Sequence, residues 1–508
     1  MPVPVALSFQ IRQNFFLPQQ TSRRQVSTPP DYPHYALSLE KPAVPARKRN
    51  GLRTVVFSFL ALLPSMVLAQ TGTATSGAQA QNGALSQLTT KLLIGQDVSL
   101  SNQSYPDVDN AIQRFRNGDV QGARLFLEKA KEKNSKLPPA EIVMAKMQSL
   151  KRNLQAVHIL LESAAVKYPD DPEAYLILAE QAFQAGRTAE ASALFEKAYG
   201  LIQKFNQNAK RKRNFTLRAL AGRAAVAERR QQWQQAAELL KQWTDLDPEN
   251  ATAHQRYGIV LFRLKKSPEA FEQFAKSREI NPNAPHPYVL AGKLYAQLGN
   301  KDKAQAAFEK AYAEEKSNSI TAQSYVDWLI QDGKLTKARQ VINGLLKEDP
   351  DSTSNLIFSS IIAQMNGKSD QAEKSLQKVL ALDPGNANAT NLLAQLLIER
   401  SDQPAQKRAL SYAQANASQF PNNGQSNITL AWILYKLGNP KQAQAALAKG
   451  LQAGGLSMDS TYLVARIMAE QNKSAQAIPL LKQLVSKNGL FIHREQAEQL
   501  LAKLQAEK

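Results

Sequence analysis

Side chains that could perform chemistry are few and scattered in this sequence. There is no cysteine, which excludes a disulfide framework, a thiolate metal site and a cysteine nucleophile. The five histidines are His34, His158, His254, His286 and His493. None of them forms the four-residue pair that binds a metal from one helix face, and the usual nucleotide, zinc, serine-hydrolase and calcium motifs are missing. We therefore expect no catalytic residue, no metal and no cofactor, and we predict that the protein is not an enzyme.

A dense basic segment is the second candidate, here for binding anions. The chain carries a net charge of +20, and one stretch of it is almost free of acids. We predict a docking patch for an acidic protein, an anionic lipid or an acidic polysaccharide, formed by Lys210, Arg211, Lys212, Arg213, Arg218 and Arg223. The alternative is a solvated loop. Nucleic acid is not expected, because no aromatic residues alternate with the run 210–213 as stacking platforms would.

The elements that must position these residues follow a fixed period. Ala270, Ala304 and Ala338 stand 34 residues apart, and an apolar residue follows each of them by four. The same slot is occupied by Ala123, Val157, Ala191, Ala236, Ala372, Ala409, Ala443 and Ala477. Such a period predicts a stacked repeat array, and the apolar spacing inside it predicts two helices per repeat. We expect helices to end at Gly186, Gly299, Gly333, Gly367 and Gly438, because glycine terminates helices.

One repeat carries a family resemblance. Tyr288, Ala291, Gly292, Tyr295, Ala304 and Phe308 have the spacing of the tetratricopeptide pattern, W-x2-L-G-x2-Y followed by A-x3-F, so the chain resembles that family. Eleven candidate units begin near Ser104, Pro138, Pro172, Leu217, Ala251, Pro285, Ser319, Thr353, Ala387, Gly424 and Met458. The resemblance implies an all-α, right-handed superhelical solenoid of antiparallel helix pairs over 104–490, with a capping helix at 491–508. Insertions around 203–213 and 401–408 are expected to be loops outside the repeat packing.

The resemblance also implies where a partner would bind. In this family the first helices line a concave groove, and repeat positions 2, 5, 9, 12 and 13 point into it. Mapped onto this chain, the predicted peptide groove contains Gln255, Ile259, Phe262, Arg263, Val289, Lys293, Gln323, Asp327, Ile357, Ile361, Ile428, Trp432 and Tyr435. This mixture of apolar and polar groups suits an extended peptide or a helix. The Asn and Lys pairs with which some relatives clamp a terminal carboxylate are missing at these positions.

The first hundred residues differ in composition from the repeats. Residues 1–46 are rich in Pro, Gln and Ser, and we predict a disordered extension. Arg47, Lys48 and Arg49 precede the apolar run 55–68, so 47–69 is predicted to be a signal peptide, cleaved before Gln70, or an uncleaved signal anchor. The Gly-, Ala- and Ser-rich residues 70–103 are expected to form a flexible linker.

Together these features favour a non-catalytic scaffold, exported to the periplasm or cell envelope, that holds protein or peptide partners, acidic ones included. One alternative is an organiser anchored in the inner membrane through residues 55–68. Another is an accessory subunit of an envelope or exopolysaccharide assembly and secretion system, because some relatives with signal peptides act there. Nothing in the sequence indicates an oligomeric state.

Overall fold

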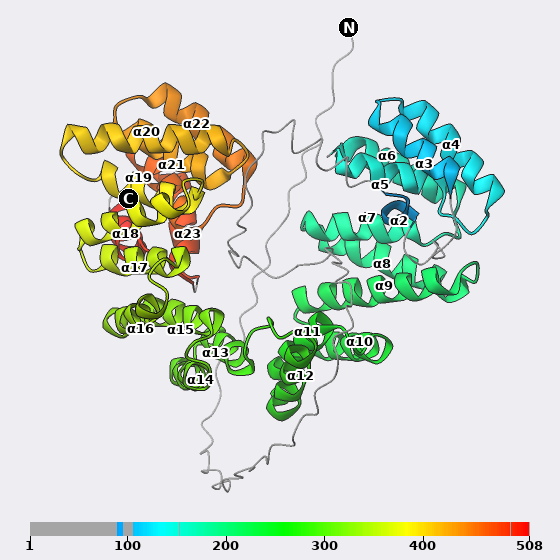
Figure 1. Ribbon diagram of the computed structural model, residues 1–508, viewed down its shortest axis with the longest axis horizontal. Helices are drawn as coiled ribbons and strands as arrows, with labels where there is room; N and C mark the ends of the chain where they lie inside the picture. Colours follow the sequence, from blue (N-terminus) through cyan, green and yellow to red (C-terminus); the bar gives the residue numbers. More distant parts are fainter. Residues whose placement is uncertain (1–88, 95–104, 152, 488, 507–508) are drawn as a thin grey trace, which may run out of the picture. The chain divides into compact units, whose positions relative to one another are not determined.

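The computed structural model describes residues 89–94, 105–151, 153–487 and 489–506. Across these residues the chain forms 24 α-helices, α2–α25, and no β-strand (Figure 1). The predicted disordered extension 1–46 and the predicted signal segment 47–69 lie outside them.

In the described part of the chain, the helices α3–α24 form eleven pairs, each with a first and a second member. The first helices are α3 (Pro106–Arg116), α5 (Ala140–Leu150), α7 (Glu173–Gln184), α9 (Ala209–Arg229), α11 (Ala251–Arg263), α13 (Pro287–Gln297), α15 (Ser319–Gln331), α17 (Thr353–Met365), α19 (Ala387–Ile398), α21 (Gly424–Lys436) and α23 (Met458–Glu470). The second helices are α4 (Val120–Lys133), α6 (Leu154–Lys167), α8 (Thr188–Lys204), α10 (Trp233–Leu246), α12 (Ser267–Ile280), α14 (Lys301–Glu314), α16 (Leu335–Glu348), α18 (Ser369–Leu382), α20 (Gln403–Gln419), α22 (Pro440–Ala453) and α24 (Ser474–Val485).

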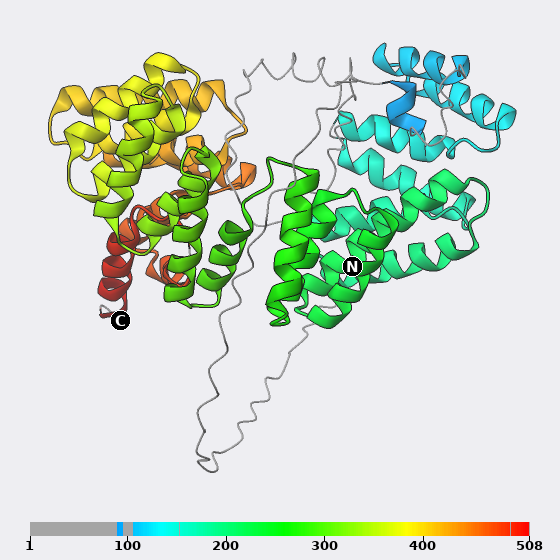
Figure 2. The ribbon, with the colours of Figure 1, turned by 60° about the horizontal axis from the view of Figure 1, so that its bottom comes forward.

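Two further helices flank these pairs. The helix α2 (Thr90–Ile94) lies inside the predicted linker 70–103, and Leu93 and Ile94 are buried in the hydrophobic core of the first pair. The helix α25 (Arg494–Ala506) follows the last pair and buries Ala497 and Leu504. Apart from α22 and α23, each helix packs against its sequence neighbour, and the succession from cyan to red can be followed in Figure 2. The predicted all-α solenoid of antiparallel helix pairs is confirmed.

The repeating alanine lies at the contact between the two helices of a pair. Ala304 is fully buried there, and so are its counterparts in the neighbouring pairs. The residue facing it is also small: a β-carbon added to Gly292 would lie 2.9 Å from the ring of Phe308, and one added to Gly258 would lie 2.5 Å from the ring of Phe274. The 34-residue period is therefore a packing rule, because a larger side chain in either slot would collide with the phenylalanine.

The turns between first and second helices also follow the prediction. Gly186, Gly299 and Gly438 have φ angles of 78°, 75° and 76°, in the left-handed region that ends a helix. The corresponding turns at Gln231 and Lys265 adopt φ angles of 58° and 63° without a glycine. A left-handed backbone conformation costs a residue with a side chain roughly 1–2 kcal/mol of conformational free energy. The packing of the helix pairs must therefore stabilise these two turns.

The prediction that both insertions are loops is wrong. The first lengthens α9, which begins at Ala209, where the side chain of Asn208 accepts hydrogen bonds from the backbone N–H groups of Lys210 and Arg211. The second lengthens α20, whose start is capped in the same way by Asp402. An N-terminal cap satisfies backbone groups that would otherwise lack a partner, so the inserted residues extend a helix at little cost.

Candidate functional site

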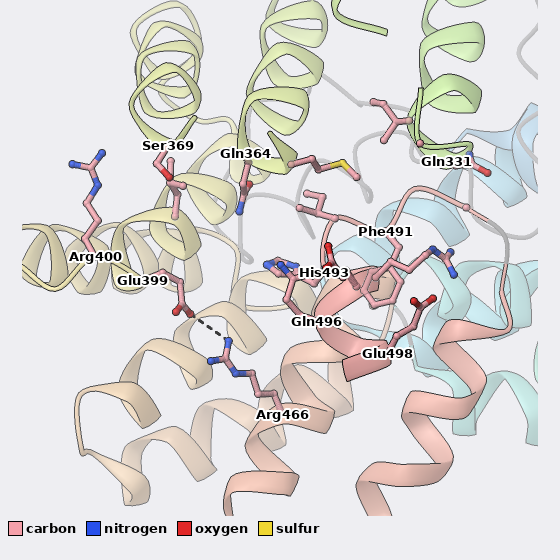
Figure 3. A pocket seen from close by; sticks show the side chains of 18 residues that line it. Gln331, Gln364, Ser369, Glu399, Arg400, Arg466, Phe491, His493, Gln496 and Glu498 are labelled. Atoms are coloured by element: carbon pink, nitrogen blue, oxygen red, sulfur yellow. Dashed lines mark hydrogen bonds and ion pairs between the residues drawn. The ribbon is translucent and has the colours of Figure 1, made fainter. Parts of the chain in front are cut away.

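A cavity of about 630 Å³ opens on the face formed by the first helices, called here the first-helix face. It is lined by α15, α17, α19 and α23 on one side, and by residues 489–498, at the start of α25, on the other (Figure 3). We name it the C-terminal pocket. Its size lies within the range of about 300–1,000 Å³ that is usual for binding sites of small ligands or peptide side chains.

The C-terminal pocket has an apolar base. Ile330, Leu396 and Phe491 are buried beneath it, and Met365 and Ile492 are half-buried at its edge. These residues come from α15, α19, α17 and the segment before α25, so no single repeat could form the base. Because Ile330, Leu396 and Phe491 are already almost fully buried, the apolar surface that a partner could cover belongs mainly to Met365 and Ile492, and covering it would be favourable by about 25 cal/mol per Å².

The cations around the C-terminal pocket are paired with acids of the same surface. Arg466 lies 3.5 Å from Glu399, the pair that is dashed in Figure 3, and its guanidinium lies 4.3 Å from the ring centroid of Trp432. Arg400 contacts Asp370 at 2.7 Å and Glu373 at 2.8 Å. The carboxylate of an ion pair cancels much of the electric field of the guanidinium, so the pair attracts an anion only weakly.

Other polar groups of the C-terminal pocket have no such partner. The side-chain amides of Gln364 and Gln496 and the carboxylate of Glu498 make no hydrogen bond or ion pair to any described residue. Figure 3 shows Gln364 extending from α17 and Gln496 from α25, on opposite sides of the pocket. Each glutamine offers two donors and one acceptor oxygen. The arrangement therefore presents unsatisfied hydrogen-bonding groups above an apolar base.

His493 holds the start of α25 in place beside this pocket. Its Nδ1 and its backbone nitrogen both lie within hydrogen-bond distance of Oδ1 of Asp459, at 2.7 and 3.0 Å. The imidazole also stacks on the ring of Tyr462, with the centroids 5.3 Å apart. Because the carboxylate accepts from Nδ1–H, the other ring nitrogen, Nε2, is left for the pocket. In the described part of the chain there is no cluster of His, Cys, Asp or Glu that could hold a metal ion.

The predicted basic patch has a different character from the one expected. Arg211 is only 3% exposed, and its Nη2 lies 3.1 Å from Asp171 and 2.9 Å from Glu173 on the neighbouring helix pair. The prediction that this run lies outside the packing is therefore wrong for Arg211. The reason is that α9 begins early and carries the guanidinium into the contact with α7.

Most of the remaining basic residues are also engaged. Arg218 makes two hydrogen bonds of 2.9 Å to Glu180, and Arg223 lies 2.7 Å from Glu196. Arg213 lies 3.3 Å from Asp247, and Lys212 donates to a backbone carbonyl. Of the six predicted patch residues, Lys210 alone is exposed with no side-chain partner among the described residues.

The buried acids near Arg211 have shifted pKa values. Burial alone would raise the pKa of Glu173, but Lys146, 2.7 Å away, and Arg211 lower it to about 2. Burial raises the pKa of Asp171, against the opposing effect of Arg211. Burial would lower the pKa of Arg211, but the two carboxylates raise it. Lys146 and Arg211 therefore favour the ionised form of Glu173, whereas burial opposes the ionised form of Asp171.

The family follows from comparison with known sequences. One tetratricopeptide repeat model matches residues 151–209, 221–285, 362–420 and 428–489, and a second matches 285–318, which together make up more than half of the chain. This chain belongs to the tetratricopeptide repeat family. The resemblance drawn from Tyr288 to Phe308 is confirmed.

Similar proteins in this family share only part of their length with the chain. A TPR repeat-containing protein of Pseudomonas aeruginosa is 26% identical over 203 residues, covering 39% of this chain and 34% of that protein. Cellulose synthase operon protein C of Escherichia coli is 26% identical over 301 residues, covering 56% and 25%. Among solved structures, yeast Tom70 aligns with a TM-score of 0.37 at 15% identity, covering 79% of this chain and 95% of that one. The chain thus spans about a third or less of these curated relatives.

The predicted groove residues lie on the first helices of five tetratricopeptide repeats, and none of them lines the C-terminal pocket. Five are buried in the core, namely Phe262, Val289, Ile361, Ile428 and Trp432. The other eight are half-buried, namely Gln255, Ile259, Arg263, Lys293, Gln323, Asp327, Ile357 and Tyr435. Whether any of these side chains contacts a partner stays a prediction.

Polar members of the predicted groove contact other polar side chains of the first helices. Gln323 donates to Asn355 at 3.2 Å, and Asp327 accepts from Gln331 at 2.9 Å. Burial raises the pKa of Asp327, and burial lowers the pKa of Lys293 on the adjacent first helix. Neighbouring repeats therefore satisfy each other's polar groups along this part of the first-helix face.

Several residues of the C-terminal pocket were not predicted, although the repeat register points to some of them. Gln364, Glu399 and Arg466 occupy positions 12, 13 and 9 of the units that begin at 353, 387 and 458. If the groove positions had been applied to every repeat unit, the sequence would have predicted these three residues. The wall formed by Gln496 and Glu498 had no such signal, because it depends on where α25 lies.

Proposed function

We propose that this protein is a non-catalytic scaffold that holds a segment of a partner protein in the C-terminal pocket. The observation that carries the proposal is the pair of unsatisfied amides, Gln364 and Gln496, on opposite sides of an apolar cavity. Some polar groups elsewhere on the first-helix face contact each other, as Gln323 does with Asn355, whereas these two amides are open to a partner. The tetratricopeptide fold itself is a protein-binding scaffold.

The proposal places the scaffold outside the cytoplasm. Residues 47–69 have the charge and apolar pattern of an export signal, and one of the relatives described above is a protein of a cellulose synthase operon. A role as an accessory subunit in exopolysaccharide assembly follows as the more specific form of the proposal. The competing form is a membrane-anchored organiser that retains residues 55–68. Among the described helices, none is both long and apolar enough to cross a membrane.

Site-specific photo-crosslinking tests the binding site. A photo-reactive amino acid at position 364 should capture a partner in the native cell, whereas the same group at position 374 should not. Lys374 is exposed on the second helix α18, away from the first-helix face, and is a matched control. Identical adducts from both positions, or none from position 364, would contradict the proposal.

Sequencing of the mature N-terminus tests the location. Protein recovered from the extracytoplasmic fraction should begin at Gln70. Recovery of the intact segment 55–68 in the membrane fraction would support the anchored organiser instead.

A further inference from the structure

We propose that the C-terminal pocket selects an extended peptide that carries a basic side chain. In this arrangement the amides of Gln364 and Gln496 bracket the peptide backbone, and Glu498 receives a lysine or arginine. The inference rests on the proposed function and names the chemistry of its partner.

The charge available to a partner in this pocket is negative. Arg400 is held by Asp370 and Glu373, and Arg466 is held by Glu399 and by Glu470 at 3.5 Å. The third cation, Arg494, donates to two backbone carbonyls at the end of α24, at 3.1 and 2.8 Å. Arg400 and Arg466 are thus paired with carboxylates, whereas the charge of Arg494 is not and offsets part of the negative charge beside it.

The exposed carboxylates of α25 remain available. Glu498 has no side-chain partner among the described residues, and Glu495 accepts a single hydrogen bond, from the neutral amide of Gln499. Both side chains are exposed at the rim of the pocket. A cation placed between them would meet two carboxylates that form no ion pair among the described residues, against the single uncompensated guanidinium of Arg494, so charge complementarity favours a basic partner over an acidic one.

The bracketing amides favour an extended backbone over a helix. An extended segment presents unpaired N–H and C=O groups, whereas a helix satisfies its own. A glutamine amide can donate to a peptide carbonyl and accept from a peptide N–H. Gln364 on α17 and Gln496 on α25 can do this from the two sides of the cavity. In an extended peptide, alternate side chains point in opposite directions, so one can cover Met365 and Ile492 while the next faces Glu498 at the rim.

Binding of labelled model peptides to the full chain tests this inference. The probes are three octapeptides in which valine alternates with lysine, glutamine or glutamate, at physiological salt. The lysine peptide should bind at least about tenfold more tightly than the glutamate peptide, since favourable and unfavourable contacts with two rim carboxylates each contribute to the ratio. Equal binding, or preference for glutamate, would overturn the inference.

Variants locate the effect within the pocket. Glu498→Gln should weaken the lysine peptide about fivefold and leave the glutamine peptide unchanged. Glu272→Gln removes an equally exposed carboxylate from the second helix α12 and should change neither. The double variant Gln364→Ala with Gln496→Ala should weaken all three peptides about tenfold, because both backbone contacts are lost. Equal effects of Glu498→Gln and Glu272→Gln on peptide binding would show that the carboxylates at the rim do not cause the preference for a basic peptide.

The outcomes separate this inference from the proposed function. If the double glutamine variant weakens all peptides and no charge preference is found, the scaffold function stands and the basic selectivity is wrong. If the glutamine variant has no effect and position 364 gives no specific crosslink, both are wrong.

Discussion

The charges of α9 and the charges of the C-terminal pocket differ in whether they are paired within the protein. Along α9 the sequence is densest in Lys and Arg, but Arg211 is buried between Asp171 and Glu173, and Arg218 and Arg223 pair with acids of α7 and α8. At the C-terminal pocket charges are fewer, but Glu498 is left without a partner. The comparison shows that the density of charge in the sequence does not indicate which charges remain unpaired in the fold.

The largest expected effect comes from breaking the buried cluster. Arg211→Met should destabilise the protein by about 3–5 kcal/mol, because two buried carboxylates lose the cation that compensates them. Lys210→Met, one residue away and exposed, should change stability by less than about 0.5 kcal/mol. Thermal or urea denaturation followed by circular dichroism measures both. If the two variants lose similar amounts of unfolding free energy, the distinction between a buried structural charge at 211 and a solvated charge at 210 is wrong.

The second effect is a dependence of stability on pH in the acid range. The pKa of Glu173 falls from an ordinary 4.5 to about 2 in the folded chain, so its contribution is complete above pH 4.5 and is lost as the pH falls toward 2. The difference corresponds to about 3 kcal/mol. The raised pKa of Asp171 acts in the opposite direction and reduces the net loss. Glu173→Gln should flatten the dependence of unfolding free energy on pH over this range, and an unchanged slope would contradict the assignment.

A smaller effect is expected from the paired charges of the C-terminal pocket. Arg466→Met removes a partly exposed ion pair with Glu399 and a contact with Trp432, and should cost at most about 1 kcal/mol. The methionine keeps much of the apolar stem of the arginine. A loss as large as that of Arg211→Met would show that this pocket also depends on its charges for folding.

The smallest effect on stability concerns the exposed lysines near the start of α9. Reversing Lys204 and Lys210 to Glu should change the unfolding free energy by less than about 0.5 kcal/mol, because neither side chain has a partner among the described residues. If these lysines dock an acidic partner, the reversal should weaken binding of poly-glutamate, and added salt should do the same in the native chain. Binding that tolerates both changes would leave this surface without a docking role. Arg211 is unsuitable for such a test, since its reversal would place a third acid in the buried cluster.

The repeat architecture was determined by local sequence patterns. Ala304, Phe308 and the glycine at 292 are separated by short, fixed intervals, and each interval maps to one contact within a helix pair. Gly299 and Gly438 mark turns because a left-handed residue is needed there and glycine adopts it without strain. Such rules act within one repeat, so the sequence alone reveals them, including the number of pairs in the described chain.

Contacts between distant residues were decided only by the tertiary structure. Asp171 and Arg211 are 40 residues apart, and no local pattern indicates that α9 starts early enough to bring them together. In the same way, the C-terminal pocket needs α17, which belongs to a repeat, and α25, which follows the last repeat more than 120 residues later. The sequence determined which residues face a neighbouring helix. Which charges and amides find partners depended on how the pairs stack, because pairing requires positions in space that residue types and spacing do not specify.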